Sequence, residues 1–123
     1  MTDVRVLLVD DEAPFLRAMS AVVEETAGFE VVGHACSGEQ SIVAAAELLP
    51  DLVLMDVNLP GMDGLEATRR LRKRRFPPVV VLLSTYDEDA GAHFVAECGA
   101  AAYVTKSAFG PDRLRVVWTA ASG

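Results

Sequence analysis

The chain has 123 residues, of which 51 % are hydrophobic and 24 % charged; these ordinary globular values exclude intrinsic disorder and fibrous repeats. The formal net charge of −7 argues against direct nucleic-acid binding by this chain, because such binding normally needs a basic surface. No apolar run approaches the ~18 residues of a membrane span, and two cysteines are too few for a disulfide framework. We therefore expect one domain over residues 1–123 that is cytoplasmic and makes no contact with membranes.

Short apolar runs alternate with longer segments of helical periodicity. The runs rich in aliphatic and β-branched residues predict strands at 4–9, 30–35, 52–55, 79–83 and 101–105. The segments that follow them predict helices over about 14–27, 37–49, 64–74, 87–98 and 111–120. Five strands alternating with five helices predict an α/β fold built on a parallel sheet.

Residues that favour helix ends mark several of these boundaries. Pro14 suits the first turn of a helix, and Ser37 with Gln40 has the spacing of a capping box. Gly28 and Gly99 are placed to end the first and fourth helices. The first helix also carries one apolar stripe, made of Phe15, Met19, Val22 and Val23.

Polar residues gather where the predicted strands end. In a parallel sheet, ligands bind outside the carboxyl ends of the strands. The residues at these ends are Asp10, Asp11 and Glu12 after the first strand, Asp56 after the third, Ser84 and Thr85 after the fourth, and Lys106 after the fifth. Random scatter would rarely put a polar residue at each of four strand ends, so we expect a functional site at this edge.

Three of the acids indicate a metal site. Asp10, Asp11 and Asp56 would crowd negative charge into one pocket, and like charges this close raise one another's pKa unless a cation intervenes. Mg²⁺ is a hard cation that takes carboxylate oxygens, water and phosphate oxygens as ligands. The alternative is that the acids after the first strand only cap the following helix. The position of Asp56 at the end of an otherwise apolar strand favours the metal site.

The same pocket predicts phosphoryl chemistry. A metal-bound carboxylate such as that of Asp56, with a lysine nearby, can act as a nucleophile toward phosphorus and form an acyl phosphate. Mg²⁺ and Lys106 would neutralise charge on the phosphoryl oxygens, and the Ser84 hydroxyl could donate a hydrogen bond to one of them. The alternatives are a metal ligand only for Asp56 and an ordinary surface lysine for Lys106.

These strand-end residues, taken in chain order, resemble the receiver domain of bacterial two-component response regulators (CheY-like), and the resemblance covers essentially the whole chain. The matching local runs are 8–11 (LVDD), 50–56 (PDLVLMD) and 59–64 (LPGMDG). Receivers often carry a proline with a cis bond after the lysine, where this chain has Ser107. That departure, with the runs 32–35 (VGHA) and 83–89 (LSTYDED), is similar to receivers of NarL/LuxR-type transcription regulators.

The resemblance implies a flavodoxin-like (βα)5 fold, a doubly wound parallel sheet with strand order 2-1-3-4-5. It implies that Asp56 accepts a phosphoryl group from the phosphohistidine of a histidine kinase, with Asp56 and Lys106 as the catalytic residues. Mg²⁺ would be coordinated by Asp11, Asp56 and the backbone carbonyl of Asn58, and by Asp10 through a water molecule. The chain would catalyse only its own phosphorylation and dephosphorylation, and would not otherwise be an enzyme.

The resemblance also implies a switch. Lys106 would pair with the phosphoryl group, Ser84, with Thr85 next to it, would move toward that group, and Tyr103 would change rotamer. Partners would read the fourth helix, fifth strand and fifth helix, at about residues 85–120. A homodimer could form through this surface or through the first and fifth helices. The output would be transcription, through a downstream helix-turn-helix domain absent from this chain.

Two rival functions stay open at this point. A haloacid-dehalogenase-like phosphatase also uses an aspartyl phosphate and Mg²⁺, but it needs a second carboxylate two residues after the nucleophile, where this chain has Asn58. A pseudo-receiver or stand-alone binding module, regulated without phosphorylation, usually lacks an acid or the lysine, and none is missing here. The basic run 69–75, with six of the eleven basic residues, is interpreted as a solvated helix end rather than a nucleic-acid site.

Overall fold

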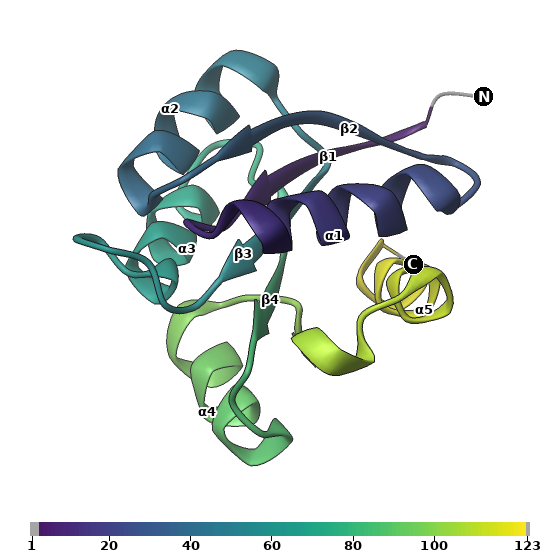
Figure 1. The fold of residues 1–123 in the computed structure, drawn as a ribbon. Coiled ribbons are helices and arrows are strands. Elements are labelled where there is room, and N and C mark those ends of the chain that lie inside the picture. The colour runs from purple at the N-terminus through teal and green to yellow at the C-terminus, as the bar shows by residue number, and fades with distance from the viewer. Residues whose placement is uncertain (1–2, 123) are drawn as a thin grey trace.

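The computed structural model describes residues 3–122. Within this range the strands are β1 (Val4–Val9), β2 (Phe29–Ala35), β3 (Leu52–Asp56), β4 (Val79–Ser84) and β5 (Ala102–Thr105). The helices are α1 (Ala13–Glu25), α2 (Gly38–Leu48), α3 (Gly64–Arg72), α4 (Glu88–Cys98), the 3₁₀ turn η1 (Lys106–Ala108) and α5 (Pro111–Ser122). All strand pairs are parallel, in the order β2-β1-β3-β4-β5 (Figure 1). The predicted α/β, flavodoxin-like, doubly wound fold is confirmed.

The alternation of side chains along the strands explains why the sheet is buried on both faces. In β3, Val53 and Met55 belong to a core shared with α2, α3 and α4, whereas Leu52 and Leu54 belong to a core shared with α1 and α5. Figure 1 shows these two sets of helices on opposite sides of the sheet. These four of the five β3 side chains are fully buried. A strand covered on both faces has no polar side to present, so it forms a continuous apolar run.

The first helix ends earlier than Gly28, the residue predicted to terminate it. α1 stops at Glu25, and the hydroxyl of Thr26 donates a hydrogen bond to the carbonyl of Val22 (2.7 Å). The Thr26 N–H donates to the carbonyl of Val23 (3.0 Å). Gly28 instead makes the turn into β2, with a φ of +89° that glycine adopts without strain. The threonine side chain therefore closes the helix before the glycine is reached.

The predicted caps of α2 and α4 are confirmed. The Ser37 Oγ accepts a hydrogen bond from the Gln40 N–H (3.1 Å), and the Gln40 side-chain oxygen accepts one from the Cys36 N–H (2.9 Å). At the other end of the molecule, Gly99 caps α4 with a φ of +81°. These caps satisfy backbone groups that would otherwise lack partners at the helix ends.

The basic run 69–75 ties α3 to its neighbours. Arg72 donates a hydrogen bond to the carbonyl of Pro78, which precedes β4 (3.0 Å). Arg74 donates to the carbonyl of Ile42 in α2 (3.0 Å). Positive charge in the last turn of a helix also opposes the helix dipole. This arrangement agrees with the interpretation of the run as a helix end, since Arg69 also donates to a backbone carbonyl, that of Glu97 (3.3 Å), and three of its arginines are thus engaged.

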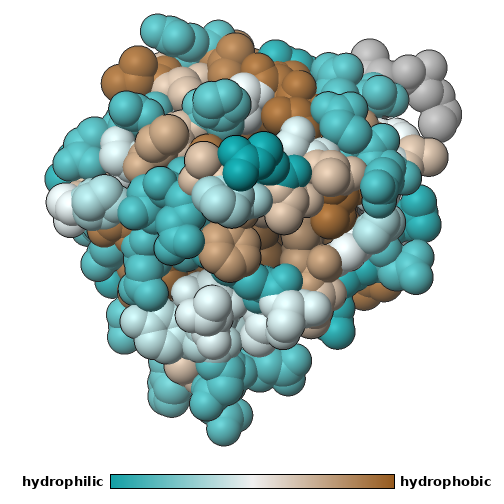
Figure 2. Space-filling model, in the orientation of Figure 1, coloured by the Kyte–Doolittle hydropathy of each residue, from teal (hydrophilic) through white to brown (hydrophobic). Residues whose placement is uncertain are grey.

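Hydrophilic side chains cover most of the face shown in Figure 2, and hydrophobic ones form small separate patches between them. The large hydrophobic residues that are exposed include Val43, Leu49, Phe76 and Val116. Among residues 3–122, no helix is both long enough and apolar enough to cross a membrane.

Candidate functional site

The carboxyl edge of the sheet brings together the residues predicted to meet there. Because β1 neighbours β3, Asp10 after β1 and Asp56 at the end of β3 lie side by side. Ser84 is the last residue of β4, directly after Leu83, which is paired with Asp56. Lys106 follows β5, one strand further out, and its long side chain reaches back to the acids. The fold therefore converts four positions distant in sequence into one site.

The three acids form a compact cluster of oxygen atoms. One carboxylate oxygen from each of Asp10, Asp11 and Asp56 lies within 4.8 Å of the others. Asp10 is fully buried, Asp56 is 4 % exposed and Asp11 is exposed. Asp10 Oδ1 accepts a hydrogen bond from the Glu12 N–H (2.9 Å). Of the three acids, Asp11 is therefore the one that opens the cluster to solvent.

The helix-capping alternative for these acids is not supported. Glu12 is the N-cap residue of α1, and its side chain makes no capping hydrogen bond. The first turn of α1 contains no acidic residue. Asp10 Oδ1 accepts a hydrogen bond from the N–H of Glu12, the N-cap residue (2.9 Å). This single bond at the helix start involves one oxygen of Asp10 and leaves Asp10 Oδ2 directed to the cluster.

Lys106 supplies the positive charge of the site. Its Nζ lies 2.8 Å from Asp10 Oδ2 and 3.6 Å from Asp56 Oδ2. The side chain is only 10 % exposed, so the ion pairs are poorly screened by water. On its remaining side the ammonium lies 3.7 Å from the centroid of the Phe15 ring. The structure thus places Lys106 beside the acids, at the edge of the sheet where the strand-end pattern puts it.

The charge state of Asp56 is set by competing neighbours. Burial is the main cause that raises the pKa of its carboxyl, from 3.8 to about 6, and the negative charge of Asp10 adds to it. Lys106 lowers this pKa, and so does the hydrogen bond that the Asn58 N–H donates to Asp56 Oδ1 (3.3 Å). At neutral pH the carboxyl is mostly ionised, although the site disfavours its charge. A cation bound at the cluster would relieve this repulsion.

The donor atoms fit a small hard divalent cation. All three clustered side chains offer carboxylate oxygens, which are the ligands such a cation prefers. Within the part of the chain that the structure describes, Asp10 Oδ2 is buried and has no hydrogen-bond donor in good geometry, although the Lys106 ammonium lies close to it. A buried carboxylate oxygen with spare lone pairs can accept a water molecule bound to a cation. One lysine against three acids also leaves a net negative charge.

Gly64 allows the loop after β3 to fold closely over the end of this strand. A Cβ atom at position 64 would overlap the carbonyl oxygen of Asp56, so only glycine fits there. The Gly64 N–H donates to the carbonyl of Val57 (2.9 Å), and Asp63 caps α3 by accepting from the Glu66 N–H (2.9 Å). These contacts fix the backbone that carries Asn58.

The predicted switch residues lie in two places. Ser84 is buried at 2 % exposure, and Thr85 is exposed at the start of the next loop. Tyr103 lies toward α4 rather than in the acid cluster. Its ring packs against the α-carbon of Gly91, and its hydroxyl donates to the carbonyl of Tyr86 (2.6 Å). Burial raises the pKa of the Tyr103 hydroxyl, which keeps it protonated and able to donate.

The loop after Lys106 differs from the arrangement that a proline would give. Residues 106–108 form the 3₁₀ turn η1, and the peptide bonds between residues 3 and 122 are all trans. The side-chain oxygens of Thr105 and Ser107 lie 3.4 Å apart. Ser107 therefore does not prevent the lysine from reaching the acids.

Two residues of the site were missed by the sequence reasoning. The sequence pattern assigns Phe15 to the apolar stripe of the first helix, yet its ring contacts the Lys106 ammonium. The one sequence feature that indicates its nearness to the site is its position in the first turn of the helix that follows Asp10 and Asp11. Tyr86 donates from its hydroxyl to Asn58 Oδ1 (3.2 Å) while its carbonyl accepts from Tyr103. It thereby links the loop after β3 to β5, and no pattern in the sequence indicates this.

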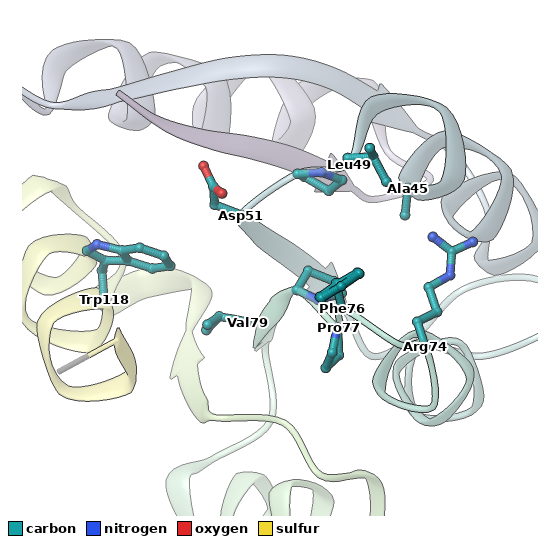
Figure 3. Close-up of a pocket in the computed structure, with 10 residues that line it drawn as sticks. Ala45, Leu49, Asp51, Arg74, Phe76, Pro77, Val79 and Trp118 are labelled. Carbon is teal, nitrogen blue, oxygen red and sulfur yellow. The ribbon is translucent and has the colours of Figure 1, made fainter. Parts of the chain in front are cut away.

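A separate hollow of about 430 Å³ lies at the opposite edge of the sheet, next to Trp118 and Phe76 (Figure 3). Its charged lining residues are already engaged. Asp51 accepts a hydrogen bond from the Arg5 N–H (2.9 Å), and Arg74 donates to a backbone carbonyl. The hollow therefore lacks the free polar groups of a reactive site.

The parallel sheet with an acidic cluster and a lysine at its carboxyl edge defines a receiver-type signalling domain. Residues 6–118 match the family model described as the response regulator receiver domain. The chain belongs to this family.

Individual relatives point the same way. The chain is 43 % identical over 105 residues to response regulator GacA of Pseudomonas viridiflava, a match that covers 85 % of this chain and 49 % of GacA. It is 32 % identical over 120 residues to the transcriptional regulatory protein LiaR of Bacillus subtilis, covering 98 % of this chain and 57 % of LiaR. The chain thus spans about half the length of these relatives.

The fold comparison agrees with the predicted NarL/LuxR-type pattern. The signal receiver domain of the response regulator NarL from Mycobacterium tuberculosis superimposes with a TM-score of 0.89 at 29 % sequence identity. The match covers 100 % of this chain and 99 % of that domain. This chain is therefore a receiver domain of the kind that acts in two-component signalling, where receiver domains interact with histidine kinases.

Proposed function

We propose that this chain accepts a phosphoryl group on Asp56 from the phosphohistidine of a histidine kinase. The observation that carries the proposal is the position of the Lys106 ammonium, 2.8 Å from Asp10 and 3.6 Å from Asp56, in a cluster of three acids. A positive charge held beside an ionised carboxylate suits the transfer of an anionic group to that carboxylate. The raised pKa of about 6 still leaves Asp56 ionised and nucleophilic at neutral pH.

In the proposed reaction an oxygen of Asp56 attacks phosphorus in line with the leaving group. The new bond joins the Asp56 carboxylate to phosphorus, the phosphorus–nitrogen bond breaks, and its electron pair stays on the kinase imidazole. Lys106 turns from Asp10 toward the phosphoryl oxygens and neutralises their charge. Burial of Asp56, at 4 % exposure, limits access of water to the acyl phosphate.

The residues that would hold Mg²⁺ are Asp11, Asp56 and the backbone carbonyl of Asn58, with Asp10 acting through a water molecule. The clustered carboxylate oxygens, and the lone pairs that Asp10 Oδ2 keeps beside its ion pair with Lys106, support this assignment. When bound, Mg²⁺ would act as a Lewis acid on the phosphoryl oxygens. The protein's own part is to hold the carboxylates and the lysine in place.

Phosphorylation would change the conformation of the loop after β4 and, through it, the surface that partners bind. The Ser84 hydroxyl, with Thr85 beside it, would bond the phosphoryl group, and Tyr103 would change rotamer as that loop moves. Of the three proposed readout elements, α4 contacts Tyr103 and β5 contains it; α5 is the third. Coupling between two such sites is typically about 1–3 kcal/mol, or roughly 5- to 150-fold in partner affinity.

The setting of the domain follows from the same proposal. Residues 1–123 would form one cytoplasmic receiver domain that catalyses no reaction beyond its own phosphorylation and dephosphorylation. The relatives, which are about twice as long and include a transcriptional regulatory protein, support a downstream DNA-binding domain as the output. Homodimers would form through α4, β5 and α5 or through α1 and α5.

The test is incubation with acetyl phosphate and Mg²⁺, followed by intact-mass measurement. The wild-type chain is expected to gain one phosphoryl group that hydroxylamine removes, and Asp56→Asn is expected to gain none. Asp112→Asn, a change at a fully exposed carboxylate, is the control and should behave as wild type. Failure of the wild-type chain to gain phosphate would support a pseudo-receiver instead, and phosphate on Asp56→Asn would place the acceptor elsewhere.

A further inference from the structure

Phe15 lies against the reactive lysine. The residue is in the first turn of α1, and the Lys106 Nζ lies 3.7 Å from the centroid of its ring. We propose that Phe15 is a positioning residue that holds the Lys106 ammonium at the acid cluster through the negative face of its ring. This inference rests on the proposed phosphoryl transfer to Asp56 for its consequence, but the contact can be tested without it.

The ammonium is enclosed by two kinds of partner. Asp10 at 2.8 Å and Asp56 at 3.6 Å attract it from the sheet. The Phe15 ring covers the side that faces α1. Because the Lys106 side chain is only 10 % exposed, bulk water has little access to the ammonium on the ring side. An aromatic face attracts a cation most strongly when that cation is poorly hydrated.

The aliphatic part of the Lys106 side chain lines a cavity in which it could adopt another conformation. A small cavity of about 80 Å³ lies between α1, β4 and the segment after β5, and Lys106 itself lines it. The other lining residues are apolar: Phe15, Ala18, Met19, Val22, Leu83 and Phe109. A lysine side chain has a flexible four-carbon stem. The Phe15 ring is one wall of this cavity, so it both attracts the ammonium and limits the space into which the stem can fold.

Contact with the Phe15 ring is compatible with movement of the Lys106 ammonium from Asp10 to the phosphoryl oxygens. During transfer the ammonium turns from Asp10 toward the new phosphoryl oxygens, and a hydrogen bond to one atom would resist that turn. Attraction to the face of a ring depends less on direction than a hydrogen bond does. Phe15 can therefore hold the ammonium before and after phosphorylation. Loss of the aromatic face should slow transfer by roughly 5- to 30-fold, which corresponds to about 1–2 kcal/mol, between the values for an exposed and a desolvated cation–ring contact.

The most direct experiment replaces Phe15 with phenylalanines that carry one, two and three fluorine atoms. Size changes little along this series, while the negative potential of the ring face falls with each fluorine. The rate constant for phosphorylation by acetyl phosphate with Mg²⁺ should fall stepwise. Phe15→Trp should retain the wild-type rate or exceed it, whereas Phe15→Leu should show the full loss. Rates that do not follow ring fluorination would overturn the proposal.

Phe109→Leu is the matched control, because Phe109 lines the same cavity. It should leave the phosphorylation rate near wild type; a loss equal to that of Phe15→Leu would show that cavity packing is responsible and would refute the proposal. In a Lys106→Met background, Phe15→Leu should have no further effect, and an additional loss of rate there would also count against it.

Nuclear magnetic resonance of the unphosphorylated protein separates this inference from the proposed function. The ring current of Phe15 should shift the Lys106 ε-proton signals upfield in the wild type and in Phe109→Leu, but not in Phe15→Leu. If the wild type shows the shift but gains no phosphate, the proposed function fails and the contact stands. If it gains phosphate without the shift, the function stands and the positioning role of Phe15 is refuted.

Discussion

Replacing Asp56 with asparagine should stabilise the cation-free protein. The carboxyl is 4 % exposed and its pKa is raised from 3.8 to about 6, mainly by burial and also by Asp10. This shift corresponds to about 3 kcal/mol that the ionised form costs the folded state at neutral pH. Asparagine is nearly the same size and neutral, and its oxygen can still accept from the Asn58 N–H. Lys106 keeps Asp10 as its partner at 2.8 Å.

The stability difference between Asp56→Asn and the wild type should depend on pH in a characteristic way. Because the folded state raises the pKa of Asp56, the stabilisation from its protonated form is fully present below pH 3.8 and is lost as the pH rises through 6. The advantage of Asp56→Asn should therefore be near zero close to pH 4 and reach its full size above pH 6. For a chain of this length, 3 kcal/mol corresponds to an increase in Tm of roughly 10 °C.

The assay is urea and thermal unfolding from pH 4.5 to pH 7.5 in the presence of a chelator. Asp3→Asn, a change at an exposed carboxylate, is the control and should alter stability by less than about 0.5 kcal/mol. An Asp56→Asn protein that is equal to or less stable than wild type at pH 7.5 would refute the reasoning. The same conclusion would follow if its advantage did not decline toward pH 4.5.

Three further predictions follow from the same contacts. Mg²⁺ at about 100 times its Kd should stabilise the wild type by about 2.7 kcal/mol in thermal unfolding, and Asp56→Asn by clearly less. Lys106→Met should raise the pKa of Asp56 above about 6, since Lys106 lowers it; carboxyl NMR titration in chelator measures this, and an unchanged or lower value would contradict the ion pair. Gly91→Ala should cost about 1–3 kcal/mol in urea unfolding by displacing the Tyr103 ring, whereas Gly110→Ala, whose Cβ would meet no described atom within 4 Å, should be near neutral.

The strand ends were predictable because their signals are local. β3 is an unbroken apolar run that stops at an acid, and such a run is typical of a strand buried on both faces of a parallel sheet. The position of Asp10 next to Asp56 then depends only on the strand order, which the resemblance supplied. Cap residues such as Ser37 act within one turn of a helix, so they could be recognised as well.

The contacts made by aromatic rings were not predictable in the same way. The Phe15 ring fits the α1 stripe equally well whether it meets another apolar side chain or an ammonium. Only the packing of α1 against the segment after β5 decides between them. Tyr86 links Asn58 to Tyr103 through contacts 28 and 17 residues apart in sequence, and no periodicity encodes such distances. The end of α1 was wrong because Thr26, a weaker signal than Gly28, lies earlier in the chain.

A crystal structure of the protein with Mg²⁺ and beryllofluoride tests the central claim most directly, because beryllofluoride imitates a phosphoryl group on a carboxylate. The expected result is beryllofluoride on the Asp56 carboxylate, with the Lys106 ammonium turned to its fluorine atoms and Mg²⁺ held by Asp11 and Asp56. A structure in which Asp56 stays unmodified at saturating concentrations of both reagents, or in which they bind away from the acid cluster, would contradict the account.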